Sequence, residues 1–203
     1  MQKPFKRQPA FDEMLASVLE RDPNGRLLLH DVDSSAEARR TALSRLEAAG
    51  CDMRRVHLIP ELPHHRLLAL YTHAEVVLDS YPASGCTTTR EALEVGALVV
   101  TLPAQYLGSR WTLAFYSIIG VTDLVASSTE DYVRIAVEMG TDVGARERMR
   151  SRISANLHKM YQRQEAIEAW IQTLLRIAGW PEDGGMILGY LAPLSRGIRV
   201  EPH

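Results

Sequence analysis

LDSYPASGCTTTREALEVGALVVT, Leu78–Thr101, is the part of this sequence from which the fold class can be predicted. It predicts the end of a buried strand, a turn at Gly85, a helix that opens with three threonines, and a second buried strand. Buried strands that alternate with helices are typical of a parallel sheet covered on both faces. The stretch therefore predicts an α/β, Rossmann-like fold, with a helix N-terminus at the carboxyl end of a strand, where such folds bind ligands.

The start of the helix in this stretch, Thr87–Thr89, is a candidate phosphate site. A helix N-terminus presents backbone N–H groups and a partial positive charge, so it can hold an anion without a basic side chain. Glu91 lies one turn further on, where its carboxylate could accept hydrogen bonds from two sugar hydroxyls. Together these features predict a nucleotide-sugar site. The alternative is an ordinary capped helix with a first-turn acid favoured by the helix dipole, and these residues alone leave both interpretations open.

The rest of the chain continues the alternation of strands and helices. Strands are expected at 26–30, 56–59, 75–79, 98–101 and 124–125, and helices at 11–20, 36–49, 63–71, 87–95, 109–119, 129–139, 143–160 and 164–178. We expect a Rossmann-like domain over 1–142, C-terminal helices packed on it over 143–178, and a loosely ordered tail over 179–203. Because no apolar strand precedes Pro4, the central first strand of the sheet is expected to be missing.

The composition limits the class of protein. Of 203 residues, 46% are hydrophobic and 24% charged, which is typical of a globular domain, and the net charge of -2 predicts neither a nucleic acid nor an anionic membrane as partner. The apolar runs are too short to span a bilayer, and no signal-peptide pattern is present. For Cys51 and Cys86, free thiols in a reducing cytoplasm are favoured over a disulfide. We expect a cytoplasmic protein.

Other polar side chains have ordinary structural interpretations. Cys86 is favoured as a small packed residue, because no histidine adjacent in sequence could act as its base. His64 and His65 are neighbours, so they point to different faces of a helix and do not share one metal ion. Neither the GxGxxG pattern of dinucleotide folds nor the GxxxxGK[ST] pattern of P-loops is present.

A resemblance to a known family connects these features. It rests on linked stretches whose order and spacing agree from Gln2 to about Leu157: QKPFK followed by PAFD, AEVVLD, GCTTTREAL, a glycine followed by VTLP, SR, and IAVEMGTD. In these stretches the chain resembles the C-terminal catalytic half of the O-linked N-acetylglucosamine transferases, in the bacterial form that carries tetratricopeptide repeats. The resemblance implies the C-terminal Rossmann-like half of a GT-B glycosyltransferase, with 1–142 as its UDP-sugar-binding domain.

The resemblance also implies roles for residues near the phosphates. Lys6 corresponds to the lysine that stabilises the departing diphosphate, and Gln2 to the polar residue beside it. Thr87 and Thr88 correspond to the pair whose hydroxyls and backbone N–H groups hold the phosphates. We therefore expect Lys6 to be the catalytic residue.

The remaining implied roles concern the nucleoside. Glu91 corresponds to the acid that binds the ribose, and the loop Leu62-Pro63-His64 to the loop that contacts uracil. Cys86 stands where the family has a histidine that contacts the diphosphate, so Cys86 is expected at the donor site but one diphosphate donor is lost. No metal is expected, because fixed N–H dipoles and one lysine can stabilise the charge that grows on the leaving group.

Together these interpretations predict the donor-binding half of an inverting, metal-independent transferase. It would move N-acetylglucosamine, or another hexose, from UDP to serine or threonine hydroxyls of proteins. The N-terminal Rossmann half and the repeats are missing, so we expect the chain to be incomplete on its own and to need a partner half. Two alternatives remain open. One is a non-catalytic UDP-binding or protein-interaction module, and the other is a GT-B transferase acting on lipids or small molecules.

Overall fold

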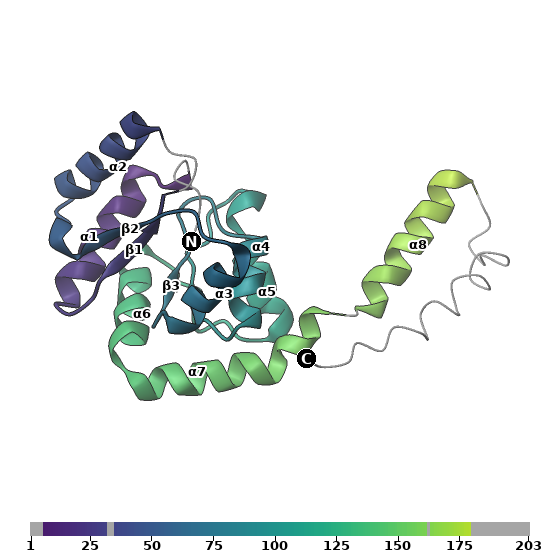
Figure 1. Ribbon diagram of the computed structural model, residues 1–203. Coiled ribbons are helices and arrows are strands. Elements are labelled where there is room, and N and C mark those ends of the chain that lie inside the picture. Colours follow the sequence, from purple (N-terminus) through teal and green to yellow (C-terminus); the bar gives the residue numbers. More distant parts are fainter. Residues whose placement is uncertain (1–5, 32–34, 162, 180–203) are drawn as a thin grey trace. The chain divides into compact units, whose positions relative to one another are not determined.

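The computed structural model describes residues 6–31, 35–161 and 163–179 (Figure 1). The chain divides into two compact units, Met1–Met160 and Tyr161–His203. The described part of the second unit is essentially one helix, α8 (Gln164–Ala178), which ends at Gly179 with a left-handed φ of 68°. Beyond Gly179, the predicted tail lies outside the described residues.

The first unit alternates helices and strands in the predicted order. Its elements are α1 (Pro9–Arg21), β1 (Leu27–His30), α2 (Ala36–Ala48), η2 (Met53–Arg55), β2 (Val56–Ile59), α3 (His64–His73), β3 (Val77–Leu78), α4 (Thr87–Glu94), β4 (Val99–Val100), η3 (Leu107–Ser109), α5 (Trp111–Ile119), α6 (Thr129–Thr141), α7 (Val143–Asn156) and η4 (Leu157–Met160).

The strands form two parallel pairs. β1 pairs with β2, with Leu27 opposite Val56, and β3 pairs with β4, with Leu78 opposite Val100. Each pair is joined through a helix, as parallel neighbours require. The predicted parallel α/β class is therefore confirmed, but among the described residues the expected sheet is present as two separate pairs.

The predicted strand at 124–125 is only one parallel bridge, between Thr101 and Val125. Thr101 donates its N–H to the Leu124 carbonyl at 3.0 Å and accepts from the Ala126 N–H at 2.8 Å. No further residue continues this ladder in the described chain, so the segment is not a full strand.

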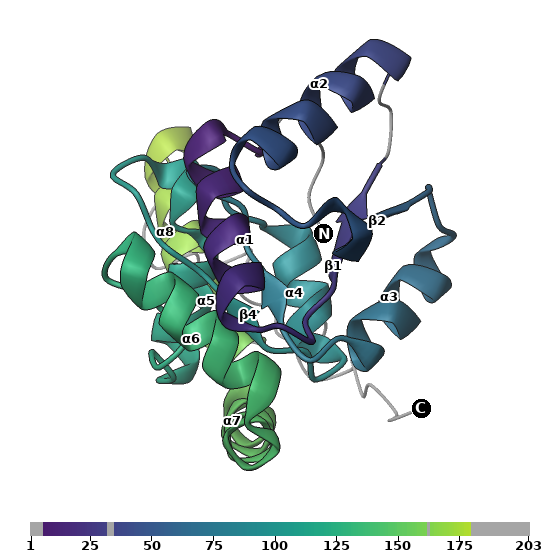
Figure 2. The same ribbon diagram turned by 90° about the vertical axis from the view of Figure 1, so that its left-hand side faces the viewer.

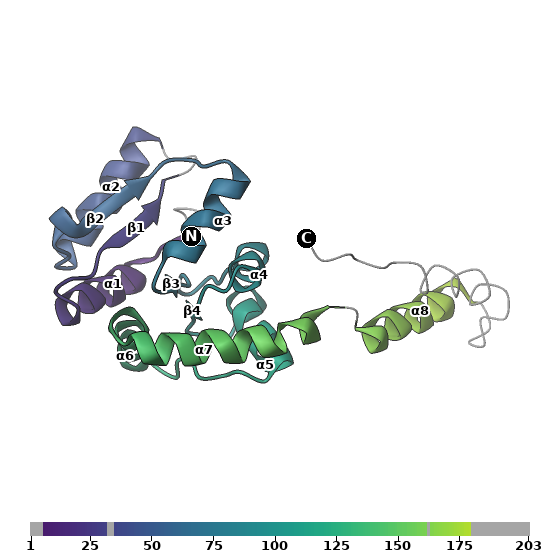
Figure 3. The same ribbon diagram turned by 60° about the horizontal axis from the view of Figure 1, so that its bottom comes forward.

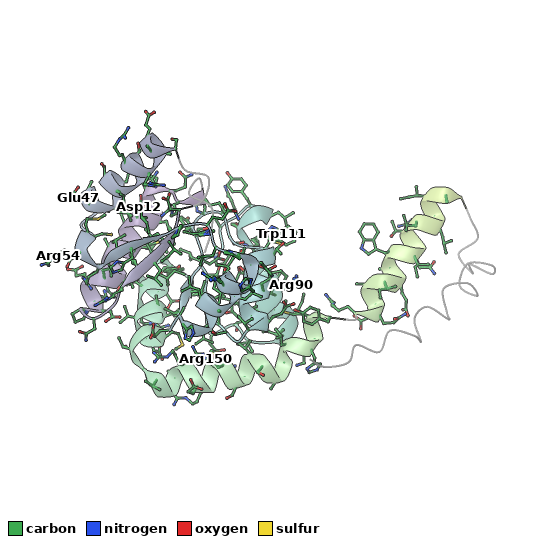
Figure 4. The ribbon with its side chains drawn as sticks, in the orientation of Figure 1. Asp12, Glu47, Arg54, Arg90, Trp111 and Arg150 are labelled. Carbon is green, nitrogen blue, oxygen red and sulfur yellow. The ribbon has the colours of Figure 1, made fainter. Side chains whose placement is uncertain are left out.

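Helices α1 and α6 lie side by side in the core of the first unit (Figures 1 and 2). Phe11 on α1 and Tyr132 on α6 meet edge to face, with ring centroids 6.3 Å apart. Asp12, labelled in Figure 4, accepts from Arg45 Nε at 2.8 Å and so ties α1 to α2. Phe11, Tyr132 and both residues of β4 are buried in this core.

Helix α7 belongs to the first unit, where it packs against α6 (Figure 3). Asp142 caps it by accepting from the Ala145 N–H at 2.9 Å. Arg146 donates to the carbonyls of Met139 and Gly140, both at 2.8 Å, and so joins α7 to the end of α6. The helix predicted over 143–160 is thus α7 followed by the short η4, while the proposed domain boundary at residue 142 stays a prediction.

The helix predicted from residue 109 begins later, at Trp111. The Ser109 hydroxyl accepts from the Ala104 N–H at 3.1 Å and donates to the Tyr106 carbonyl at 2.5 Å. Ser109 therefore closes the turn before α5 and does not cap the helix.

Two further properties concern membrane-spanning helices and cysteines. No helix in the described part of the chain is long and apolar enough to cross a membrane. Cys51 is buried and Cys86 half-buried, and neither forms a disulfide.

Candidate functional site

The candidate site is built around Asp79, which follows β3 directly and is only 2% exposed. Its Oδ1 accepts from the Gly85 N–H at 2.7 Å, and its Oδ2 accepts from the hydroxyls of Thr101 at 2.8 Å and Thr112 at 2.7 Å. Burial raises the pKa of Asp79, while these three donors act in the opposite direction. The carboxyl group therefore fixes the turn that leads from β3 into α4.

Neighbouring helices are connected to the same residue. The Thr112 hydroxyl on α5 lies 3.2 Å from the hydroxyl of Thr89 on α4. Tyr132 on α6 donates its hydroxyl to the Asp79 carbonyl at 2.9 Å. The start of α4 is thus held in a fixed position by buried hydrogen bonds to the strand end and to two other helices.

Helix α4 begins at Thr87, and its N-cap residue Cys86 provides no side-chain cap. Its first helical hydrogen bond runs from the Arg90 N–H to the Cys86 carbonyl at 3.0 Å. Amides before that point in a helix have no carbonyl of the same helix to bond to. Thr87 is exposed and Thr88 half-buried, so an anion can approach this end of α4.

Lys6 lies beside the same turn although it is 78 residues away in sequence. Its Nζ donates to the Ser84 carbonyl at 3.0 Å. An antiparallel bridge between Arg7 and Pro82 fixes the backbone next to it. The ammonium group is therefore fixed one residue before Gly85, close to the start of α4.

Glu91 and His64 face each other between α4 and α3. His64 Nε2 lies 3.9 Å from Glu91 Oε1, and the Glu91 side chain is 17% exposed, against 64% for His64. Tyr71 on α3 is buried, and its pKa is raised to about 12, chiefly by burial and then by the charges of Glu91 and Asp79. The tyrosine therefore keeps its proton at neutral pH and remains a hydrogen-bond donor.

The structure thus brings five of the predicted site residues to one region of the domain. They are Lys6 beside the turn, Thr87, Thr88 and Glu91 along the first turns of α4, and His64 opposite Glu91. In sequence they come from three separate segments.

The three other predicted site residues are Cys86, Leu62 and Gln2. Cys86 is the N-cap of α4 and so lies at the site. Leu62 is half-buried in the loop before α3, two residues from His64. Gln2 lies outside the described residues.

The turn is held in place by three residues that were not predicted from the sequence: Asp79, Thr101 and Thr112. A signal existed for Asp79, because an acidic residue directly after an apolar strand lies at the ligand-binding edge of a parallel sheet. Its partners could not be found from sequence, since they are 22 and 33 residues away. In the described chain, no three His, Cys, Asp or Glu side chains gather in a way that could hold a metal ion.

Several known proteins are similar in sequence to this chain. The sequence model of glycosyl transferase family 41 matches residues 1–165. A probable UDP-N-acetylglucosamine–peptide N-acetylglucosaminyltransferase SPINDLY of Eustoma exaltatum subsp. russellianum is 33% identical over 147 residues, covering 71% of this chain and 16% of the relative. A UDP-N-acetylglucosamine–peptide N-acetylglucosaminyltransferase of Caenorhabditis elegans is 38% identical over 80 residues, covering 39% of this chain and 7% of the relative.

A solved structure has the same fold. A mutant of the Thermobaculum terrenum O-GlcNAc transferase superposes with a TM-score of 0.67 at 31% identity, covering 75% of this chain and 29% of that chain. The present chain therefore spans less than a third of the length of these relatives.

Proposed function

We propose, because this chain belongs to glycosyl transferase family 41, that it forms the nucleotide-sugar-binding half of a protein glycosyltransferase. One observation carries the proposal: Lys6, the start of α4 and Glu91 converge on one preorganised turn. A cation and a helix N-terminus suit a diphosphate, and a carboxylate one turn away suits a ribose. The donor would be UDP-N-acetylglucosamine, the nucleotide sugar named in the relatives.

Each residue has a separate role in this proposal. Thr87 and Thr88 hold the phosphates through their amides and hydroxyls, and Lys6 stabilises the departing diphosphate. Glu91 accepts hydrogen bonds from the ribose. The loop that carries Leu62 and His64 contacts the uracil.

The proposed reaction is inverting transfer without a metal ion. A serine or threonine hydroxyl of a protein acceptor attacks C1 of the sugar, the bond from C1 to the diphosphate oxygen breaks, and the electron pair leaves with UDP. Negative charge grows on the diphosphate, where the amides at the start of α4 and the Lys6 ammonium stabilise it. The site offers these groups already positioned, so little reorganisation is needed during the reaction.

The acceptor side of the site would come from another part of the assembly. The chain spans 16% of the first plant relative and 29% of the solved bacterial chain. We propose that a partner half supplies the acceptor groove and the group that removes the hydroxyl proton, and that the isolated chain binds donor but turns over weakly. We propose that the protein works in the cytoplasm, because Cys51 and Cys86 are free thiols. The net charge of -2 favours neither a nucleic acid nor an anionic membrane as partner.

Titration calorimetry with UDP tests donor binding. Lys6→Ala and Thr88→Val should each weaken UDP binding about tenfold or more, since each removes a contact to a charged phosphate. The matched controls are Lys159→Ala, an exposed lysine at the end of the first unit, and Thr129→Val, a first-turn threonine of α6. The controls should bind UDP as the parent chain does.

Two outcomes separate the proposal from its alternative. If the parent chain is folded by circular dichroism but binds no UDP, the chain is a protein-interaction module derived from this fold. If it binds UDP and also glycosylates a peptide at a normal rate alone, the partner half is unnecessary and that part of the proposal is wrong.

A further inference from the structure

Exposed apolar side chains gather on the turn between β4 and α5. Tyr106 is 68% exposed, Leu107 is 70% exposed, and Trp111, labelled in Figure 4, is 37% exposed. They are three of the five large hydrophobic side chains that are exposed in the described part of the first unit, and they stand within six residues. Together with Arg110 we call them the aromatic platform. Clustered exposed apolar side chains are typical of a binding surface, whereas single ones are not.

The backbone of the platform is a closed turn. The Arg110 N–H donates to the Leu107 carbonyl at 3.0 Å, and Arg110 Nη1 donates to the Ala104 carbonyl at 3.1 Å. Ser109 is buried and closes the same turn from inside. Because residues three apart lie on one side of a 3₁₀ turn, Leu107 and Arg110 face outward together. A partner would therefore meet side chains whose backbone is already ordered, which lowers the entropic cost of binding.

The platform is attached to the turn that precedes α4. The Ser84 N–H donates to the Gly108 carbonyl at 3.0 Å, and the carbonyl of the same serine accepts from Lys6 Nζ at 3.0 Å. Thr112, directly after the platform, donates its hydroxyl to Asp79 at 2.7 Å. The platform and Lys6 are thus bonded to one residue, so the exposed apolar side chains border the proposed donor site.

The chemistry of the platform favours a polypeptide as its partner. From Thr101 to Thr122 the only charged residue in the sequence is Arg110, so the surface is apolar with one positive charge. Tyrosine, tryptophan and arginine are the residues that most often anchor protein interfaces. Small molecules instead bind in concave sites, and Tyr106 and Leu107 project from a turn. A polypeptide with apolar side chains and a carboxylate for Arg110 therefore fits best.

We propose that the aromatic platform binds the acceptor polypeptide beside the donor turn. It favours acceptors in which apolar residues flank the reactive hydroxyl and an acidic residue lies within reach of Arg110. The proposal rests on the donor-binding function proposed above, because the platform gains this role from its place beside Lys6. The platform acts in addition to the groove assigned to the partner half. Tyr106 and Leu107 determine specificity and take no part in breaking the sugar–phosphate bond.

Fluorescence anisotropy with the full 203-residue chain measures acceptor binding directly. The probe is a capped, fluorescein-labelled peptide, Glu-Leu-Val-Ser-Val-Leu-Glu, in which apolar residues flank one serine. The double variant Tyr106→Ala, Leu107→Ala should bind it about tenfold or more weakly, because both side chains lose apolar area that binding would bury. Val143→Ala is the matched control, since Val143 is an apolar residue 61% exposed at the start of α7. It should bind the peptide as the parent chain does.

Two changes in the peptide test the chemistry of recognition. Replacing its four apolar residues by glutamine should weaken binding about tenfold or more, because the apolar contact is lost. Replacing both glutamates by lysine should weaken binding about two- to fivefold, as expected for an exposed ion pair. Arg110→Gln should remove this preference between the glutamate and lysine peptides, because it removes the charge that distinguishes them.

A conjugate tests whether the platform and the donor turn act together. In it, the serine oxygen of the peptide is joined through a short flexible linker to the β-phosphate of UDP. The conjugate should bind the parent chain about tenfold or more tightly than UDP alone, because the second contact becomes intramolecular when the sites are adjacent. In the double platform variant the affinity of the conjugate should fall to that of UDP, while UDP itself should bind as it does to the parent chain.

Several results would overturn the proposal. Absence of peptide binding by the folded parent chain, or equal binding by the parent and the double variant, would mean that the platform does not bind acceptors. Equal binding of the apolar and glutamine peptides would reject the proposed specificity. A conjugate no tighter than UDP, although UDP and peptide each bind, would place the peptide away from the donor turn. Platform-dependent peptide binding without any UDP binding would instead reject the donor function proposed above, so the two failures are distinguishable.

Discussion

Replacing Asp79 by alanine should loosen the turn before α4. The substitution removes the acceptor for three donors: the Gly85 N–H and the hydroxyls of Thr101 and Thr112. Asp79 is 2% exposed, so water does not readily replace the lost carboxyl oxygens. The turn would then lose its connection to the strand end.

The expected loss in the free energy of unfolding depends on which of the three donors have another acceptor. The Thr112 hydroxyl already lies 3.2 Å from the Thr89 hydroxyl and 3.5 Å from the Gly85 carbonyl, so it can be satisfied there. The Gly85 N–H and the Thr101 hydroxyl have no alternative acceptor among the described residues. Each buried donor without a partner costs about 1–3 kcal/mol, so Asp79→Ala should lower the free energy of unfolding by about 2–6 kcal/mol.

Asp79→Asn is the matched control. Its amide oxygen can still accept from the Gly85 N–H, and its NH₂ group can donate to the threonine hydroxyls, which also act as acceptors. It should cost only about 1 kcal/mol, since the shape and the number of hydrogen bonds are kept. Urea unfolding followed by circular dichroism measures both variants.

A second measurement links the turn to the donor site. At a temperature where both variants are folded, Asp79→Ala should weaken UDP binding, and Asp79→Asn should retain most of it. Equal unfolding free energies for the alanine variant and the parent chain would refute the reasoning, because they would mean that the three hydrogen bonds do not hold the turn.

Three more predictions follow from the same contacts. Burial raises the pKa of Asp79 above its ordinary value of 3.8, so between these two pKa values the Asp79 carboxyl is protonated in the folded chain but ionised in the unfolded chain. The free energy of unfolding should therefore fall as the pH rises from 3.8 through the raised pKa. Urea midpoints against pH would show this slope for the parent chain, and a slope unchanged in Asp79→Asn would contradict it. Glu91→Gln should weaken binding of UDP but not of inorganic pyrophosphate, because the carboxylate is assigned to the ribose; calorimetry with both ligands measures the difference, and an equal loss for both would reject the assignment. Tyr116→Phe should lower the unfolding free energy by about 2–4 kcal/mol by leaving two backbone groups of Val99 unpaired, whereas Tyr106→Phe, at a residue 68% exposed, should change it little.

Much of the fold was predictable because its signals are local. The strand over 56–59 and the helix over 164–178 have the predicted bounds, and α4 begins at the predicted Thr87. Apolar runs, Gly85 and the threonines after it carry that information within a few residues. The grouping of Lys6 with this turn came from the resemblance to a family, and the hydrogen bond from Lys6 to Ser84 places it there.

What the sequence could not provide depends on distant partners. Ser109 closes a turn with Ala104 and Tyr106, and this delays α5 to Trp111, although a serine before an apolar run is a common helix cap. The Asp79 hydrogen bonds join residues far apart in sequence. The separation of the two strand pairs also depends on which strand edges form hydrogen bonds with another strand. The hydrophobic pattern of the sequence does not specify which strands pair.

The hydrogen bond from Lys6 to the Ser84 carbonyl has a consequence for the thermodynamics of ligand capture. A lysine side chain that is free to rotate carries about 2 kcal/mol of rotamer entropy, which ordering removes. Because Lys6 is half-buried and already bonded to Ser84, much of that entropy is lost when the chain folds. A diphosphate would therefore meet an ammonium group whose motion is already restricted, and the entropic penalty of capture would be correspondingly small.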